Sequence, residues 1–294
     1  VLLKNQSVFK GESLLPLKQG KYKHILVVGD NAVRNLMAGG GSSELKPKMV
    51  ITPLEALVKE LGSDCVTFSQ GYMAGRPMFD RADVIPQSVA DSLYNAAIEE
   101  ARKADLVIFM GGLNKNYQQD CEGEDRRAYE LPYGQDRLIE GLLKANKKLV
   151  VVLTSGNAVA MPWLKEVPSL VQSWYLGSIG GKALADVLLG EVTPSGKLPF
   201  SYPAKLEDCP AHYYGEISYP GDSIRQEYKE DILVGYRWYD TKHIQPLFPF
   251  GYGLSYTQFE YGKPVISARE MKGDDVLEIR CNVKNVGRVA GKEI

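Results

Sequence analysis

Residues 104–139 read ADLVIFMGGLNKNYQQDCEGEDRRAYELPYGQDRLI, and this stretch decides how the chain folds. It opens with an apolar run, Leu106–Met110, which is typical of a buried strand and ends at two glycines. Its last residues begin an amphipathic pattern over residues 136–145, which predicts a helix. A strand, a long polar loop and a helix in this order form one unit of an α/β fold.

The same alternation continues on both sides of this stretch. Apolar runs predict strands at residues 25–28, 65–68, 106–110, 149–153 and 170–174, and periodic runs predict helices at residues 54–61, 89–104, 136–145 and 182–189. The strands are almost continuous in Val, Ile and Leu, so helices should cover both faces of the sheet. The predicted fold is α/β, with a mostly parallel six-stranded sheet sandwiched by helices.

The character of the sequence changes near Ser201, where it becomes irregular and rich in Tyr, Pro and Gly. A strand is suggested there only over residues 233–239. Residues 276–283 alternate and are followed by a Gly-flanked break at 285–291, as in the first strands of a β-sandwich. This segment is too short to close a sandwich, which takes roughly 100 residues. We therefore expect two units, residues 1–255 and an incomplete one at 256–294.

Composition narrows the possible partners. The 294 residues carry 35 basic and 36 acidic side chains without a long run of one sign, which argues against nucleic acid and anionic membranes as partners. No apolar run approaches the roughly 20 residues that cross a bilayer. The 4 cysteines lack metal-ligand spacing, so we expect free thiols and no metal site. The opening VLLKNQ has neither an initiator Met nor a leader, so we expect the interior of a longer polypeptide.

The polar loop after residue 112 is where chemistry is expected, because ligands of open α/β sheets bind beyond the carboxyl ends of the strands. It contains Asp120, Glu122, Glu124, Asp125, Arg126, Arg127 and Glu130. By composition alone, a solvated loop with local ion pairs is the favoured interpretation, and composition would not identify a catalyst.

Several motifs resemble glycoside hydrolase family 3. EGxDR at residues 122–126, followed by Leu131-Pro132 and Gln135, is similar to the acid/base loop of its β-glucosidases and β-xylosidases. The other matching stretches are GGGSS (39–43), WYLGSIGGKALADVLLGEVTPSGKLPFSYP (174–203), PLFPFGYGLSYTQFEY (246–261) and the opening VLLKN with LLPL (14–17). The resemblance covers essentially the whole chain.

This resemblance implies a retaining, exo-acting hydrolase of terminal non-reducing β-D-glucosyl residues. In the family, a barrel-borne Asp is the nucleophile and a Glu of the α/β sandwich domain is the general acid/base. The match assigns the second role to Glu122, with Glu124 as runner-up. Asp120 is expected to be loop structure. Arg126 is expected either to brace Asp125 or Glu124 or to form a surface ion pair. The chain lacks the family's SDW-like nucleophile motif, so we expect an inactive part that works with an N-terminal (β/α)8 barrel. Two carboxylates and water suffice for this chemistry, so no cofactor is expected.

The resemblance also implies names for the two units and candidates for sugar contacts. Residues 1–255 would be the family's C-terminal α/β sandwich domain, and residues 256–294 the start of its fibronectin type III-like domain. Tyr117, Phe79 and Met78 follow predicted strands and are candidates for the aglycone subsite, although such side chains more often simply pack. Ser42 could hydrogen-bond sugar or merely form a turn.

Two alternatives remain at this point. A β-xylosidase of the same family would carry a very similar loop. A non-catalytic carbohydrate- or nucleotide-binding module would share the sheet pattern, although Gly39–Gly41 lacks the GxGxxG spacing of a dinucleotide site. The sequence does not give the compartment, and a periplasmic or secreted location would fit the family.

Overall fold

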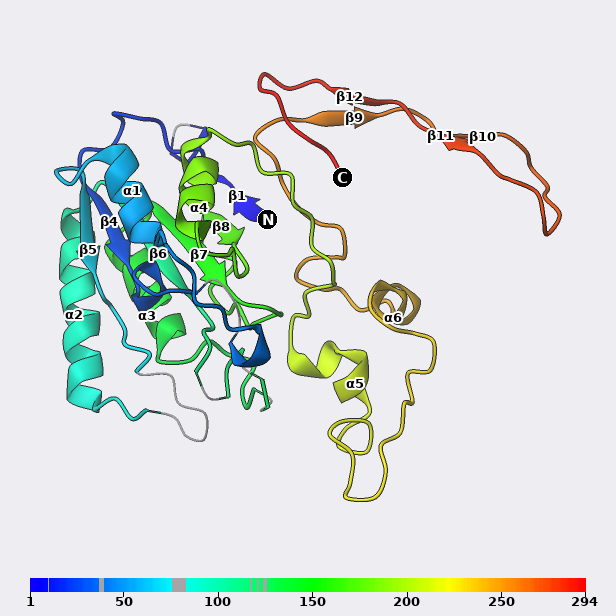
Figure 1. Ribbon diagram of the computed structural model, residues 1–294, viewed down its shortest axis with the longest axis horizontal. Coiled ribbons are helices and arrows are strands. Elements are labelled where there is room, and N and C mark those ends of the chain that lie inside the picture. Colours follow the sequence, from blue (N-terminus) through cyan, green and yellow to red (C-terminus); the bar gives the residue numbers. More distant parts are fainter. Residues whose placement is uncertain (10, 37–39, 76–82, 117, 121, 124–125) are drawn as a thin grey trace.

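The computed structural model describes residues 1–9, 11–36, 40–75, 83–116, 118–120, 122–123 and 126–294 (Figure 1). Its centre is a six-stranded sheet in the order β1-β8-β7-β6-β4-β5. The strands are β1 (Leu2–Asn5), β4 (Ile25–Val28), β5 (Val66–Ser69), β6 (Leu106–Gly112), β7 (Leu149–Thr154) and β8 (Ser169–Gln172). All neighbours pair in parallel except β1 and β8. The predicted mostly parallel sheet is confirmed.

Four helices cover the sheet, two on each face (Figure 1). They are α1 (Pro53–Leu61), α2 (Gln87–Lys103), α3 (Gln135–Ala145) and α4 (Gly180–Leu189). Helices α2 and α3 pack on one face, and α1 and α4 on the other. Each helix lies within one or two residues of the bounds predicted for it, because its apolar residues recur at helical spacing.

Strand β6 shows why the strands are apolar throughout. Val107 and Phe109 belong to the core beneath α2 and α3, whereas Leu106, Ile108 and Met110 belong to the core beneath α1 and α4. Successive side chains of a strand point to opposite faces, so a sheet covered on both sides needs apolar residues at every position. Every residue of β6 is buried as a result.

The edge strand β1 was not among the strands predicted from sequence. Its residues Leu2 and Leu3 are buried, and it pairs antiparallel with β8. It leads to a small hairpin of β2 (Ser7–Phe9) and β3 (Glu12–Ser13). The short opening segment therefore completes the sheet at the side opposite β5.

The strand expected over residues 233–239 is wrong. The chain forms helix α6 (Tyr236–Lys242) there, directly after Gly235 at φ +62°. Trp238 and Tyr239 are adjacent and both buried, which strand alternation would not allow on a half-exposed sheet. The Trp238 indole N–H donates to the carbonyl of Asp208 at 3.0 Å. Aromatic residues favour strands intrinsically, and tertiary packing overrides that preference here.

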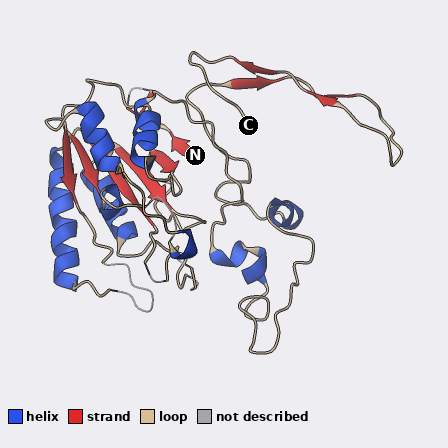
Figure 2. Cartoon of the chain, in the orientation of Figure 1, coloured by secondary structure: helices blue, strands red, loops and turns tan. Residues whose placement is uncertain are grey.

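Beyond α4 the chain is mostly loop and leaves the sandwich (Figure 2). It contains the one-turn helix α5 (Pro210–Tyr213) and α6, and then two separate antiparallel strand pairs. The pairs are β9 (Phe259–Tyr261) with β12 (Val283–Asn285), and β10 (Val265–Ile266) with β11 (Ile279–Arg280). The side chains of β10, β11 and β12 are exposed.

The two-sided core gives a first prediction. Leu142 of α3 is fully buried against the sheet, whereas Leu45 is 67% exposed. Leu142→Ala should lower the free energy of unfolding by about 2–5 kcal/mol because it leaves a cavity. The matched substitution Leu45→Ala should change it by less than about 0.5 kcal/mol. Urea unfolding followed by circular dichroism measures both, and equal losses would contradict the assigned core.

Candidate functional site

The order of the strands creates a topological switch point between β4 and β6. The chain passes from β4 through α1 to β5 on one side, and then returns through α2 to β6 on the other side. The loop after β4 leads to α1 and the loop after β6 leads to α3. These two helices lie on opposite faces, so the loops diverge at this point (Figure 1). A ligand site of an open α/β sheet is expected at such a switch point.

The loops that follow β4 and β6 contact each other above the switch point. The backbone N–H of Ser42, in the short turn Gly41–Ser43, donates to Oε2 of Glu122 at 2.5 Å. Nearby, the Lys115 ammonium pairs with Oε1 of Glu44 at 2.6 Å. The structure thus brings together Ser42 and Glu122, two of the residues predicted from sequence, although 80 positions separate them.

Glycine is required on the β4 side of this contact. Gly41 has φ +65°, and a Cβ there would overlap the Cβ and Oε2 of Glu122. Gly40 has φ +94°, and a Cβ there would lie 2.9 Å from the Cβ of Lys115. L-residues rarely adopt these backbone angles, and the missing side chains allow the two loops to touch.

The base of the β6 loop is closed by Gln135, the first residue of α3. Its buried amide accepts from the N–H of Gly112 and donates to the carbonyl of Gly112, both at 2.8 Å. It also donates to the carbonyl of Pro132 at 3.0 Å. Gln135 therefore holds the two ends of the loop together. The residues between them extend from the sheet as one continuous loop.

Further contacts join this loop to the segments that follow β7 and β8. The Asp120 carboxylate accepts from the N–H of Gly156 at 2.5 Å, from the side-chain amide of Asn157 at 3.1 Å and from the hydroxyl of Tyr175 at 2.9 Å. Sequence reasoning treated Asp120 as loop structure and missed these partners, because they come from two other strand ends.

Arg126 is mostly withdrawn from water and donates to the carbonyl of Ala158 at 2.7 Å. Its guanidinium lies 5.8 Å from the ring centroid of Tyr129. Burial lowers the pKa of Arg126, and the negative charge of Asp120 opposes that shift. Arg126 was expected to brace Asp125 or Glu124, and both of these lie outside the described residues. The contact with Ala158 gives the loop another link to the segment after β7.

The carboxyl group of Glu122 is exposed and has a lowered pKa. The hydrogen bonds from the backbone and side chain of Ser42 favour the ionised form and lower the pKa below the ordinary value of 4.5. In this chain Glu122 is therefore a carboxylate at neutral pH, and its side chain is exposed.

The remaining residues predicted to contact substrate or to serve as runner-up catalyst lie outside the described residues. These are Met78, Phe79, Tyr117 and Glu124. Among the described residues, no group of three or more His, Cys, Asp or Glu side chains is arranged to hold a metal ion.

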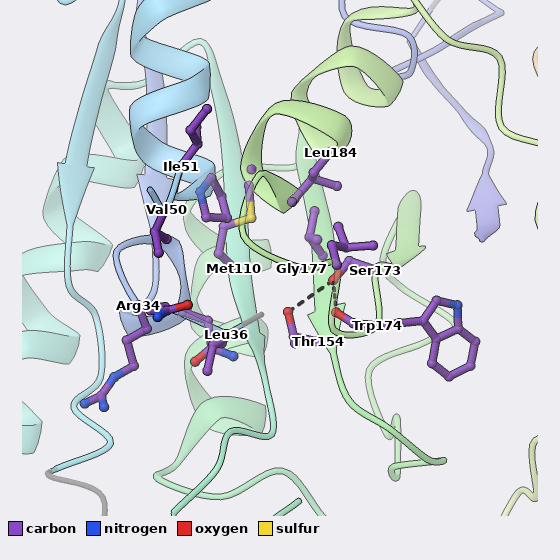
Figure 3. A pocket seen from close by; sticks show the side chains of 17 residues that line it. Arg34, Leu36, Val50, Ile51, Met110, Thr154, Ser173, Trp174, Gly177 and Leu184 are labelled. Carbon is purple, nitrogen blue, oxygen red and sulfur yellow. Dashed lines mark hydrogen bonds between the residues drawn. The ribbon is translucent and has the colours of Figure 1, made fainter. Parts of the chain in front are cut away.

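A separate cavity lies on the sheet between α1 and α4 (Figure 3). It is lined by Ile51, Met110 and Leu184, and by Thr154 and Ser173, whose hydroxyls are 3.1 Å apart. Its volume of about 40 Å³ holds a few water molecules at about 10–15 Å³ each. A volume of this size is too small to enclose a whole hexose.

The family model for the glycosyl hydrolase family 3 C-terminal domain matches residues 1–256. The chain belongs to this family, and the resemblance noted from its motifs is confirmed. It is 70% identical over 294 residues to β-glucosidase BoGH3A of Bacteroides ovatus, covering all of this chain and 39% of that protein. It is 39% identical over 296 residues to thermostable β-glucosidase B of Acetivibrio thermocellus, covering 36% of that protein.

Solved structures agree with this assignment. DesR, a β-glucosidase from Streptomyces venezuelae in complex with D-glucose, superposes with a TM-score of 0.86 at 28% identity over 99% of this chain and 47% of its own. The glucose complex of Kluyveromyces marxianus β-glucosidase superposes with a TM-score of 0.81 at 27% identity, over 98% of this chain and 50% of its own. The chain thus spans about half or less of the proteins it matches. None of the helices in the described ranges is long and apolar enough to cross a membrane.

The contact between Gly41–Ser43 and Glu122 gives a second prediction. Gly41→Ala should push the two loops apart, and the pKa of Glu122 should then rise toward its ordinary value because the Ser42 donors are lost. Ionised Glu122 accepts these bonds, so their contribution to stability exists above the ordinary pKa and disappears as pH falls through the lowered pKa.

The measurement is an NMR titration of the Glu122 side-chain carboxyl carbon. The matched control is Gly62→Ala, since Gly62 also has a positive φ, +92°, but no atom lies within 4 Å of an added Cβ. That control should leave the pKa of Glu122 unchanged. An unshifted titration of Glu122 in the Gly41→Ala variant would show that Ser42 does not control its ionisation.

Proposed function

We propose that this chain supplies the general acid/base, Glu122, of a retaining β-glucosidase that removes terminal non-reducing β-D-glucosyl residues. The observation that carries the proposal is the exposed Glu122 carboxyl held at the switch point between β4 and β6. Membership of glycoside hydrolase family 3 and relatives named β-glucosidases support the substrate class. The alternative of a β-xylosidase has no such relative among those described above.

The same proposal includes an N-terminal (β/α)8 barrel that carries an Asp nucleophile. Retention needs two carboxyl groups about 5–5.5 Å apart on opposite sides of the scissile bond. The nucleophile attacks the anomeric carbon while the acid protonates the leaving oxygen, and the same group then activates water. Residues 1–255 would be the sandwich domain and residues 256–294 the start of a fibronectin type III-like domain.

The lowered pKa of Glu122 suits only the second step of this reaction, in which the carboxylate activates water. An ionised carboxylate can accept a proton from water in the second step, but the first step needs a protonated acid. A second carboxylate about 5 Å away would raise the pKa of Glu122, because two neighbouring negative charges repel. The barrel would therefore supply the charge that converts Glu122 into an acid.

Substitution of Glu122 in the polypeptide that carries this chain and the barrel tests the proposal. Glu122→Ala should lower kcat/KM for alkyl β-glucosides by about 10²–10⁴-fold, because their leaving oxygen needs a proton. For 2,4-dinitrophenyl β-glucoside, whose leaving group needs none, the loss should be much smaller. Added azide should restore turnover of the activated substrate and release glucosyl azide.

Two results would contradict the proposal. An unchanged rate for the alkyl glucoside in the Glu122→Ala variant would favour a non-catalytic sugar-binding module. A higher kcat/KM for β-xylosides than for β-glucosides in the unsubstituted protein would identify a β-xylosidase.

The division of the site between two domains gives a separate prediction. The chain of residues 1–294 alone should not hydrolyse 4-nitrophenyl β-glucoside above the buffer rate, because the proposed nucleophile belongs to the barrel. Mixing it with the separately expressed barrel domain should restore measurable turnover. Hydrolysis by the isolated chain would place the nucleophile within it and would contradict the assignment to the barrel.

A further inference from the structure

The loop that carries Glu122 is fastened at Asp120, only two residues before it. We propose that Asp120 is a positioning residue, whose carboxylate clamps the Glu122 loop to the segments that follow β7 and β8. This inference rests on the proposed role of Glu122 and assigns a second residue to that function.

The contacts of Asp120 use both of its oxygens. Oδ2 accepts from the N–H of Gly156 at 2.5 Å and from the hydroxyl of Tyr175 at 2.9 Å, and Oδ1 accepts from Asn157 at 3.1 Å. The Asp120 N–H donates to the carbonyl of Asn114 at 3.0 Å, within its own loop. Hydrogen bonds to an ionised acceptor are roughly twice as strong as neutral ones. A single side chain therefore joins three strand ends.

Two residues span at most about 7 Å of extended chain, so Glu122 cannot move far while Asp120 is held. Glu122 is fastened from the other side by Ser42 and, further back, by the ion pair of Lys115 with Glu44. The segment that carries the catalytic carboxyl is thus held between the loops of β4 on one side and of β7 and β8 on the other.

Asp120 acts by fixing the position of Glu122. The causes of the lowered pKa of Glu122 are the hydrogen bonds of Ser42 and a small opposing effect of burial, and Asp120 is not among them. Removal of the clamp should therefore impair the steps in which the position of Glu122 matters and spare those in which it does not. This separates a positioning role from general damage to the fold.

The test uses kcat/KM of the polypeptide that joins this chain to the barrel, which reports the first chemical step. Asp120→Ala should lower kcat/KM for an alkyl β-glucoside by about 10²-fold, since a displacement of about 1 Å can cost this much. For 2,4-dinitrophenyl β-glucoside the change should stay within about 3-fold. Glu130→Ala, an exposed carboxylate of the same loop, is the matched control and should alter neither value.

A double-mutant cycle decides whether Asp120 acts through Glu122. In the Glu122→Ala background, Asp120→Ala should cause no further loss, because the group that it positions is already absent. Additive losses, or equal losses for both glucosides in the single variant, would overturn the inference. If Glu122→Ala itself shows no dependence on the leaving group, the proposed acid/base role fails instead.

Two milder variants keep the test valid if Asp120→Ala does not fold. Asp120→Asn retains the shape and one acceptor oxygen, and Tyr175→Phe removes one donor. Each should lower kcat/KM for the alkyl glucoside by about 3–10-fold and leave that for the dinitrophenyl glucoside unchanged. The absence of this selectivity in both folded variants would overturn the inference.

Discussion

The divergence of the chain at β4 is the constraint on which the site depends. Right-handed connections place α1 on one face and α3 on the other, so the loops after β4 and β6 separate above adjacent strands. The hydrogen bond from Ser42 to Glu122 closes that separation at one point. It is possible only because Gly41 presents no side chain to the approaching loop. The position of the exposed carboxyl therefore follows from the topology and from the contacts that join the two loops.

Much of the sandwich could be predicted because local pattern and tertiary environment agree there. Ile25–Val28 is apolar at every position and is buried on both faces, so the predicted and observed strands coincide. Where the local sequence pattern and the tertiary environment disagree, the prediction was wrong. Residues 233–239 contain Val, Tyr and Trp and suggest a strand, but Gly235 and the packing of Trp238 produce a helix. The edge strand β1 was missed because its pairing depends on β8, far away in sequence.

The candidate site also has parts that could be predicted from the sequence and parts that could not. Glu122 and Ser42 could be singled out by their motifs, yet their mutual contact could not, since no local signal joins residues so far apart. Asp120 shows more clearly what could not be predicted from the sequence. Its sequence context is that of a solvated acidic loop, and its partners Gly156, Asn157 and Tyr175 follow other strands. Only the parallel order of β6, β7 and β8 brings those strand ends to one edge of the sheet.

The ionisation state of Glu122 determines which steps of the proposed reaction its carboxyl group can perform. A group that must donate a proton and later accept one needs a pKa that its surroundings can raise, and in this chain every strong influence lowers it. In the proposed mechanism, contacts within the chain set the position of the carboxyl, whereas a charge from the barrel would set its protonation. Placement and acidity would then be controlled by different domains. An enzyme built in this way would be active only when both domains are joined, which would prevent an isolated half from carrying out uncontrolled chemistry.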